Sequence, residues 1–158
     1  MRRTVEYRIS DLLKGSGNTL SAAESCTGGR ISHLITTVSG SSGYYLGSVT
    51  SYAISVKEKI LGVSKETIEK YGVVSDKVAA EMAEGIRKVT GSTYSVATTG
   101  LAEGGDDRYP EGTVWIGVSG PSGTVTEMFT CNLGRKGNIR HFAYHALLFL
   151  ETYIKSNN

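Results

Sequence analysis

The alternation of helical and strand-like segments is the feature that most constrains the fold of this chain. Apolar residues recur at every third or fourth position in some segments, which is typical of one helix face, and gather in short β-rich runs in others. The expected helices cover residues 5–13, 31–38, 56–61, 64–71, 75–91 and 139–154, and the expected strands cover residues 19–23, 44–52, 93–99, 113–119 and 124–131. The last two strands read as a β-hairpin, and the whole order predicts a three-layer α/β domain with a mixed sheet of about five strands.

The composition is that of a folded globular domain. Hydrophobic residues make up 39% of the chain and the formal net charge is +2, whereas a disordered chain has few aliphatic residues and a large net charge. The length of 158 residues suits one domain, so residues 1–158 are treated as a single unit. The 20 glycines predict several turns with positive φ, or places where the backbone approaches a ligand.

Several kinds of location and partner are not expected. The longest apolar run, Ala146–Leu150, is far shorter than the roughly 20 residues of a membrane-spanning helix, and no apolar block follows Met1 as a signal peptide would require. A cytoplasmic location is therefore the default expectation. Cys26 and Cys131 lie far apart and are interpreted as free thiols. With 17 basic and 15 acidic residues there is no dense basic stripe, so a nucleic-acid partner is not expected.

Ser25 has the position best suited to chemistry. It stands where the first expected strand gives way to a helix, and Gly28 and Gly29 follow it, so the free N–H groups of the helix start are expected to point at its hydroxyl. Ligand sites in such folds lie beyond the carboxyl ends of strands, which makes this loop and the loop after Thr99 the two candidate positions. The alternative interpretation is that Ser25 or Thr27 simply caps the helix.

A serine nucleophile needs a base, and the chain offers histidines and a lysine. His33 lies inside an expected helix, while His141 and His145 share one helix face and are more typical of solvated histidines than of metal ligands. Lys57 follows the second strand and could reach the same sheet edge as Ser25. Because an ordinary lysine is charged at neutral pH, a basic role requires burial or nearby positive charge that lowers its pKa.

Both candidates have competitors. Cys26 is a possible nucleophile beside Ser25, because a helix N-terminus lowers the pKa of a thiol. No histidine partner for Cys26 is evident, so it ranks below Ser25. Lys57 could equally be an ordinary surface lysine.

Short motifs that span most of the chain resemble a single family in their order and spacing. They are Ala23–Gly29, Gly40–Gly47, the spacing from Tyr52 to Lys57, Leu61–Val63, Tyr71–Ser75, Met82–Gly85, Thr99–Ala102 and Gly112–Trp115. Together they resemble the CinA C-terminal domain family, most specifically in A-E-S-C-T-G-G and the downstream G-T-V-W. The resemblance implies a mixed-sheet α/β/α sandwich and a homodimer or larger homo-oligomer.

The resemblance also implies an activity and a set of site residues. The family is known for hydrolysing the carboxamide of nicotinamide mononucleotide, which yields nicotinate mononucleotide and ammonia. On that basis Ser25 is the nucleophile, Lys57 the base and Tyr52 a supporting catalytic residue, with a nucleotide as substrate and with no cofactor or metal. Substrate contacts are expected from Thr27, Gly28, Gly29, Ser42, Thr99, Gly100 and Arg140.

The chain departs from the family pattern at three places around these motifs. Ile54 replaces an asparagine, Glu103 stands in the loop after Thr99, and Arg135 replaces the aspartate of a G-D-R motif. A carboxylate at position 103 disfavours a phosphorylated ligand nearby, so two alternatives stay open: an amidase for a related phosphorylated substrate, and a nucleotide-binding module without turnover. The substrate phosphate is assigned to Arg140, which matches a family arginine, with Arg108 as the alternative.

Overall fold

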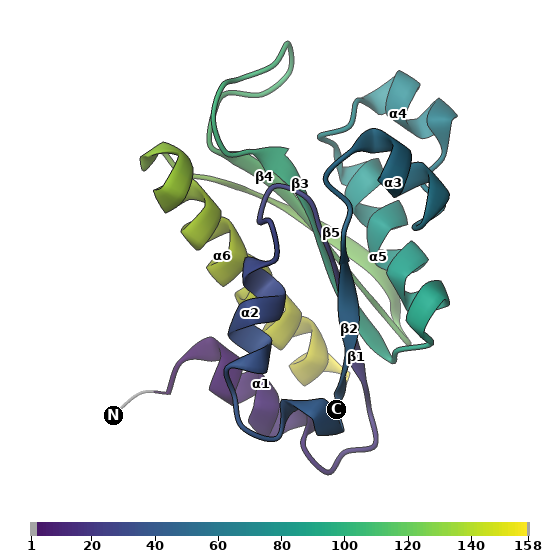
Figure 1. Ribbon diagram of the computed structural model, residues 1–158, viewed down its shortest axis with the longest axis vertical. Helices are drawn as coiled ribbons and strands as arrows, with labels where there is room; N and C mark the ends of the chain where they lie inside the picture. The colour runs from purple at the N-terminus through teal and green to yellow at the C-terminus, as the bar shows by residue number, and fades with distance from the viewer. Residues whose placement is uncertain (1–2, 158) are drawn as a thin grey trace.

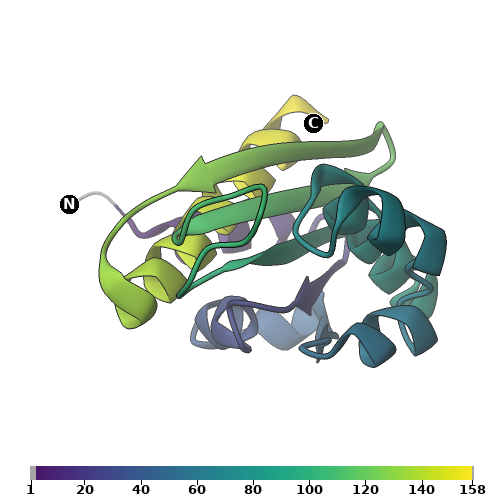
Figure 2. The same cartoon turned by 90° about the horizontal axis from the view of Figure 1, so that it is seen from above.

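A computed structural model, which describes residues 3–157, has a five-stranded mixed sheet between two layers of helices (Figures 1 and 2). The expected α/β sandwich is thereby confirmed. The prediction that no signal peptide is present concerns a segment that starts at Met1. Met1 and Arg2 lie outside the described residues. The strands are β1 (Leu20–Glu24), β2 (Tyr45–Thr50), β3 (Tyr94–Leu101), β4 (Thr113–Gly120) and β5 (Gly123–Thr130).

The sheet has the order β2-β1-β3-β4-β5 and combines parallel and antiparallel pairs. β1 runs parallel to both β2 and β3, with Ala23 opposite Val49 on one side and Ala97 on the other. β4 and β5 are antiparallel and form the expected hairpin. The three parallel strands therefore end at one edge of the sheet, which we call the carboxyl edge.

The two helical layers cover opposite faces of the sheet. Figure 1 shows α1 (Val5–Leu13), α2 (Arg30–Thr36) and α6 (Gly134–Ser156) on one face, and α3 (Ile54–Lys59), α4 (Lys65–Tyr71) and α5 (Asp76–Thr90) on the other. Each face has its own hydrophobic cluster: Ala22 packs toward the first layer, and its neighbour Ala23 packs toward the second. Successive side chains of a strand point to opposite faces, so the central strands are buried on both sides.

Element boundaries differ from the sequence expectation near the carboxyl edge. β1 includes Glu24, which had been assigned to the polar turn, and β3 continues to Leu101 instead of ending at Thr99. α6 begins at Gly134, five residues before its apolar pattern starts. The buried side chain of Asn138 explains the early start, because it accepts a hydrogen bond from the Leu133 amide and donates one to the carbonyl of Ala102. Within residues 3–157, no helix combines the length and apolar character needed to cross a bilayer.

Candidate functional site

Ser25 and Lys57 meet at the carboxyl edge of the sheet. Ser25 directly follows β1, and Lys57 lies on α3, the helix that follows β2. Lys57 Nζ lies 2.8 Å from Ser25 Oγ, and both residues are buried. Two residues that the sequence suggested separately therefore form one hydrogen-bonded pair, which we call the Ser–Lys pair.

The environment of Lys57 favours a neutral amine. Only 1% of the residue is exposed, and Nζ donates to the backbone carbonyls of Ser51 at 2.6 Å and Tyr52 at 3.1 Å. Burial lowers the pKa of Lys57 from its ordinary 10.5 to about 8, and only a negative charge on Cys26 would act in the opposite direction. At pH 7 roughly a tenth of the amine is then neutral, against well under 0.1% for an ordinary lysine. In the neutral form, two N–H bonds serve the carbonyls and the lone pair is left for Ser25 Oγ.

The N-terminus of α2 is held by Glu24 and is not free to serve a ligand. The Glu24 carboxylate accepts hydrogen bonds from the amides of Gly29, Ile31 and Ser32 at 3.2, 2.9 and 3.0 Å, and Thr27 Oγ1 donates to it at 2.6 Å. The expectation that these amides point at Ser25 is therefore wrong. The buried Glu24 carboxylate instead accepts hydrogen bonds from the backbone N–H groups that the helix itself leaves unpaired. These bonds fix the turn that carries Ser25.

Glu24→Gln should destabilise the fold by about 2–3 kcal/mol, because the variant loses the charge of an acceptor and places NH₂ hydrogens against amide donors. The measurement is the free energy of unfolding from urea denaturation at neutral pH. Glu69→Gln is the matched control, since Glu69 is exposed on α4. Equal stabilities of the two variants would contradict the role given to Glu24.

Cys26 is poorly suited to act as the nucleophile. Burial raises the pKa of its thiol to about 12, and Lys57 and the hydrogen bond from Thr98 offset this only in part. The sequence expectation of a thiol activated by the helix N-terminus is wrong, because Glu24 occupies that N-terminus. The structure thus favours Ser25 over Cys26.

Tyr52 contacts both the Ser–Lys pair and two charged side chains at the surface, Arg135 and Glu103, the second of them through Arg135. Its carbonyl accepts a hydrogen bond from Lys57 Nζ, but the residue is 60% exposed and its hydroxyl accepts a hydrogen bond from Arg135 Nη2 at 3.2 Å. Arg135 also forms a loose ion pair with Glu103, at 3.9 Å between Nη1 and Oε1. Arg135 and Glu103 are both departures from the family pattern, and their opposite charges pair beside the site. Sequence reasoning noted both positions but gave no sign that they pair.

Thr99 and Gly100 lie in β3 beside the pair, where they serve the backbone. Thr99 is buried and donates its hydroxyl hydrogen to the carbonyl of Val73 at 2.8 Å. A Cβ on Gly100 would lie 2.5 Å from the carbonyl oxygen of Thr113, so only glycine allows β4 to approach this closely. Arg108, the alternative phosphate ligand, instead donates to the carbonyls of Lys70 and Tyr71 at the end of α4. The Arg108 guanidinium therefore stabilises the end of α4 through these hydrogen bonds.

The remaining predicted contacts divide between the site and other parts of the chain. Thr27 is buried against Glu24 and Thr98, and the φ of 103° at Gly29 starts α2 in a left-handed conformation. Ser42 precedes β2 and so lies at the amino end of that strand, whereas Ser25 follows the carboxyl end of the parallel strand β1. The contact of Ser42 with a substrate stays a prediction, and this position separates Ser42 from Ser25 along the strand direction. Arg140 is exposed and lines a cavity between α1, α2 and α6.

The histidines do not supply a base or a metal site in the described chain. The His145 ring stacks on Phe129 with centroids 3.5 Å apart, and burial lowers the pKa of His145. Residues 3–157 contain no group of three His, Cys, Asp or Glu side chains arranged to hold a metal ion.

The fold and the site define a class: an α/β/α sandwich with a buried Ser–Lys pair at the carboxyl ends of its parallel strands. The model of the CinA C-terminal domain matches residues 2–154. The chain belongs to that family, as its motifs had suggested.

Similar proteins and structures agree with this membership. The chain is 49% identical over 121 residues to a CinA-like protein of Salinibacter ruber, covering 75% of this chain and 29% of that protein. It is 44% identical to a CinA-like protein of Desulfosudis oleivorans, covering 90% and 35%. The chain thus spans about a third of the length of these curated relatives. A crystal structure of a competence-damaged protein (CinA) superfamily protein from Enterobacter cloacae superposes with a TM-score of 0.92 at 30% identity, covering 98% of this chain and 94% of that one. The competence/damage inducible protein CihA of Agrobacterium tumefaciens gives 0.88 at 30% identity, with coverages of 98% and 99%.

Proposed function

We propose that this protein is an amidohydrolase that cleaves the carboxamide of nicotinamide mononucleotide or a closely related phosphorylated amide. The observation that carries the proposal is the 2.8 Å contact between a buried lysine amine and a buried serine hydroxyl. A lysine whose pKa is near 8 is a competent base at neutral pH, and a serine needs a base within hydrogen-bond reach to attack an amide.

In the first half of the reaction, neutral Lys57 takes the proton of Ser25 as Oγ bonds to the carboxamide carbon. The carbonyl π electrons move to oxygen and form a tetrahedral oxyanion. The amides of Cys26 and Thr27 are the nearest candidate donors in sequence, since among the described residues neither donates a hydrogen bond to another residue. The intermediate collapses as the C–N bond breaks, and the Lys57 ammonium returns its proton to the leaving nitrogen, which departs as ammonia.

In the second half, a water molecule hydrolyses the ester on Ser25. Neutral Lys57 takes a proton from the water, the hydroxide adds to the ester carbon, and the C–O bond to Ser25 breaks. Oγ recovers its proton from Lys57, and the product is the carboxylic acid. The two backbone carbonyls that hold Nζ keep the amine in place through both proton transfers.

An ammonia-release assay tests the function directly. Nicotinamide mononucleotide, nicotinamide riboside and free nicotinamide should be compared at equal concentration, with steady release expected from the mononucleotide. Release from a different phosphorylated amide alone would place the protein with the related amidases, and binding without release from any of them would make it a binding module. A homo-oligomeric state and a cytoplasmic location stay predictions.

Cys26→Ala should retain at least about half of the wild-type rate of ammonia release, because a thiol with a pKa near 12 contributes almost no thiolate at neutral pH. Initial rates at saturating substrate are the measurement, with circular dichroism to check the fold. A loss of activity comparable to that expected for Ser25→Ala would move the nucleophile to the sulfur.

A further inference from the structure

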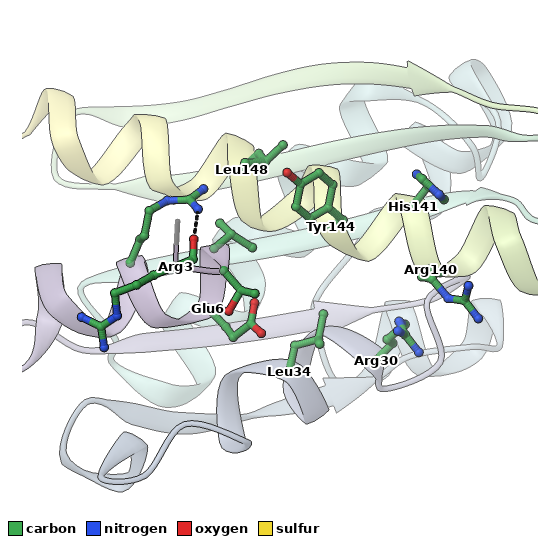
Figure 3. Close-up of a pocket in the computed structure, with 11 residues that line it drawn as sticks. Arg3, Glu6, Arg30, Leu34, Arg140, His141, Tyr144 and Leu148 are labelled. Carbon is green, nitrogen blue, oxygen red and sulfur yellow. Dashed lines mark hydrogen bonds between the residues drawn. The ribbon is translucent and has the colours of Figure 1, made fainter. Parts of the chain in front are cut away.

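A cavity of about 520 Å³ lies between α1, α2 and α6, on the face of the sheet opposite α3 (Figures 1 and 3). Its lining comes from all three helices and does not include Ser25, Lys57 or Tyr52. The reaction proposed for the Ser–Lys pair therefore does not account for this cavity.

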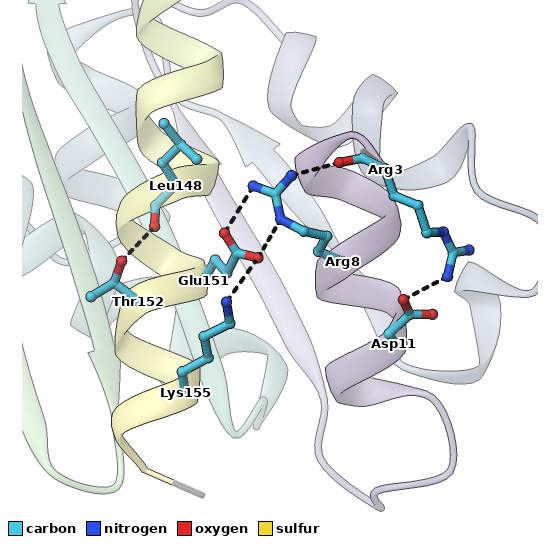
Figure 4. A network of polar contacts seen from close by, with 7 residues as sticks. All are labelled: Arg3, Arg8, Asp11, Leu148, Glu151, Thr152 and Lys155. Atoms are coloured by element: carbon cyan, nitrogen blue, oxygen red, sulfur yellow. Dashed lines mark hydrogen bonds and ion pairs between the residues drawn. The ribbon is translucent and has the colours of Figure 1, made fainter. Parts of the chain in front are cut away.

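One end of the cavity is electrically balanced. Arg3 pairs with Asp11 at 2.6 Å, and Arg8 pairs with Glu151 at 2.7 Å (Figure 4). Glu151 in turn holds the pKa of the Arg8 guanidinium above its ordinary value. Both arginines at this end are therefore paired with carboxylates, one on α1 and one on α6.

The other end carries positive charge that no carboxylate balances. Figure 3 shows Arg30 of α2 and Arg140 of α6 at this end, with His141 above them. Within residues 3–157 neither arginine forms an ion pair. Arg30 Nε is moreover buried without a hydrogen-bond partner, which is unfavourable unless a partner binds there. An anion between the two guanidinium groups would supply that partner.

The middle of the cavity combines apolar side chains with one carboxylate. Leu34 of α2 and Tyr144 and Leu148 of α6 line it, and Glu6 of α1 lies on the side of Leu34 away from Arg30 and Arg140 (Figure 3). An occupant therefore has a compact anionic group at the Arg30 end and an apolar or aromatic body along the apolar side chains. Two planar guanidinium groups suit a tetrahedral dianion well, because each can donate two parallel hydrogen bonds.

We propose that this cavity is a binding site for a phosphomonoester with an apolar or aromatic body, whose phosphate is held by Arg30 and Arg140. The inference goes beyond the proposed amidase activity. The phosphate can come from the mononucleotide whose carboxamide lies at Ser25, or from a separate phosphate ester. Arg30 is the new residue in this assignment, since sequence analysis selected Arg140 alone.

Phenyl phosphate is the probe, and its dissociation constant is measured by isothermal titration calorimetry on the full chain at low salt. Saturable binding with one site per chain is expected. Arg30→Leu and Arg140→Leu should each weaken it by about tenfold or more, the effect of losing one charge-assisted hydrogen bond. Arg30→Lys and Arg140→Lys keep the charge and should lose less. Lys136→Leu, an exposed position on α6 outside the cavity lining, is the control and should change the constant by less than about twofold.

The proposal is overturned if phenyl phosphate does not bind saturably, or if the two leucine variants bind it as the wild type does while remaining folded by circular dichroism. Because the readout is binding, a failure of the amidase proposal leaves this test intact. Competition experiments then separate the two sources of phosphate. If nicotinamide mononucleotide displaces phenyl phosphate and the leucine variants raise KM for the mononucleotide but not for the riboside, the substrate phosphate occupies the cavity. If both ligands bind together, a separate phosphate ester does.

Discussion

Ser25→Ala should reduce ammonia release by roughly 10⁴-fold or more, the scale of loss when a hydrolase loses its nucleophile. The fold should survive, because the Ser25 hydroxyl contacts Lys57 Nζ, which keeps the carbonyls of Ser51 and Tyr52 as acceptors. The free energy of unfolding should therefore change by no more than about 1 kcal/mol. The measurements are initial rates with nicotinamide mononucleotide and urea denaturation of the same preparation.

Ser55→Ala is the control for this variant. Ser55 is an exposed serine on α3, two positions from Lys57, and should leave the rate unchanged. If Ser25→Ala kept wild-type turnover, Ser25 would be only a structural residue of the turn, and the covalent mechanism would be wrong.

Lys57→Met should lower the rate by a similar factor, because methionine keeps much of the apolar stem and removes the amine that takes the proton. Removal of a buried, desolvated amine should not destabilise the protein strongly, although the carbonyls of Ser51 and Tyr52 lose a donor. The rate and the dissociation constant for substrate are measured separately, since a base acts on turnover more than on binding.

Lys59→Met provides the comparison for the lysine variant. Lys59 is exposed on the same short helix and should be dispensable for turnover. Near-normal activity of Lys57→Met would assign Lys57 a purely structural role and remove the base from the mechanism.

Much of the architecture was predictable from local patterns. The 3.6-residue period and the β-rich runs located all six α-helices and all five strands of the described chain, because apolar faces must be buried against a sheet. The start of α6 was missed, since it depends on one buried asparagine and carries no apolar repeat.

The candidate site was predictable only in part. Ser25 and Lys57 emerged from their positions after β1 and β2, because parallel neighbours end at the same edge. No sequence pattern predicts the contact between them. The same is true of the hydrogen bonds by which Glu24 holds the α2 N-terminus, which take up the Gly29 amide and leave the Cys26 thiol without the expected activation. Hydrophobic periodicity cannot predict the hydrogen bonds of a buried glutamate in a glycine-rich turn.

Arg135 and Arg140 illustrate the same limit for charged side chains. Both are exposed cations near the start of α6, and a sequence cannot tell which way each one points. Arg135 lies against Tyr52 and Glu103, whereas Arg140 shares a cavity with Arg30. Helical spacing alone did not separate these roles.

The pH dependence of kcat/KM for ammonia release tests the Ser–Lys pair most directly. The neutral form of Lys57 is the active one, so the rate should rise about tenfold per pH unit below the pKa and level off above it, with the midpoint near the pKa of about 8. The rise should be absent from the residual activity of Lys57→Met. A wild-type profile that is flat from pH 6.5 to 9.5, or that falls as the amine loses its proton, would contradict the assignment of Lys57 as the base.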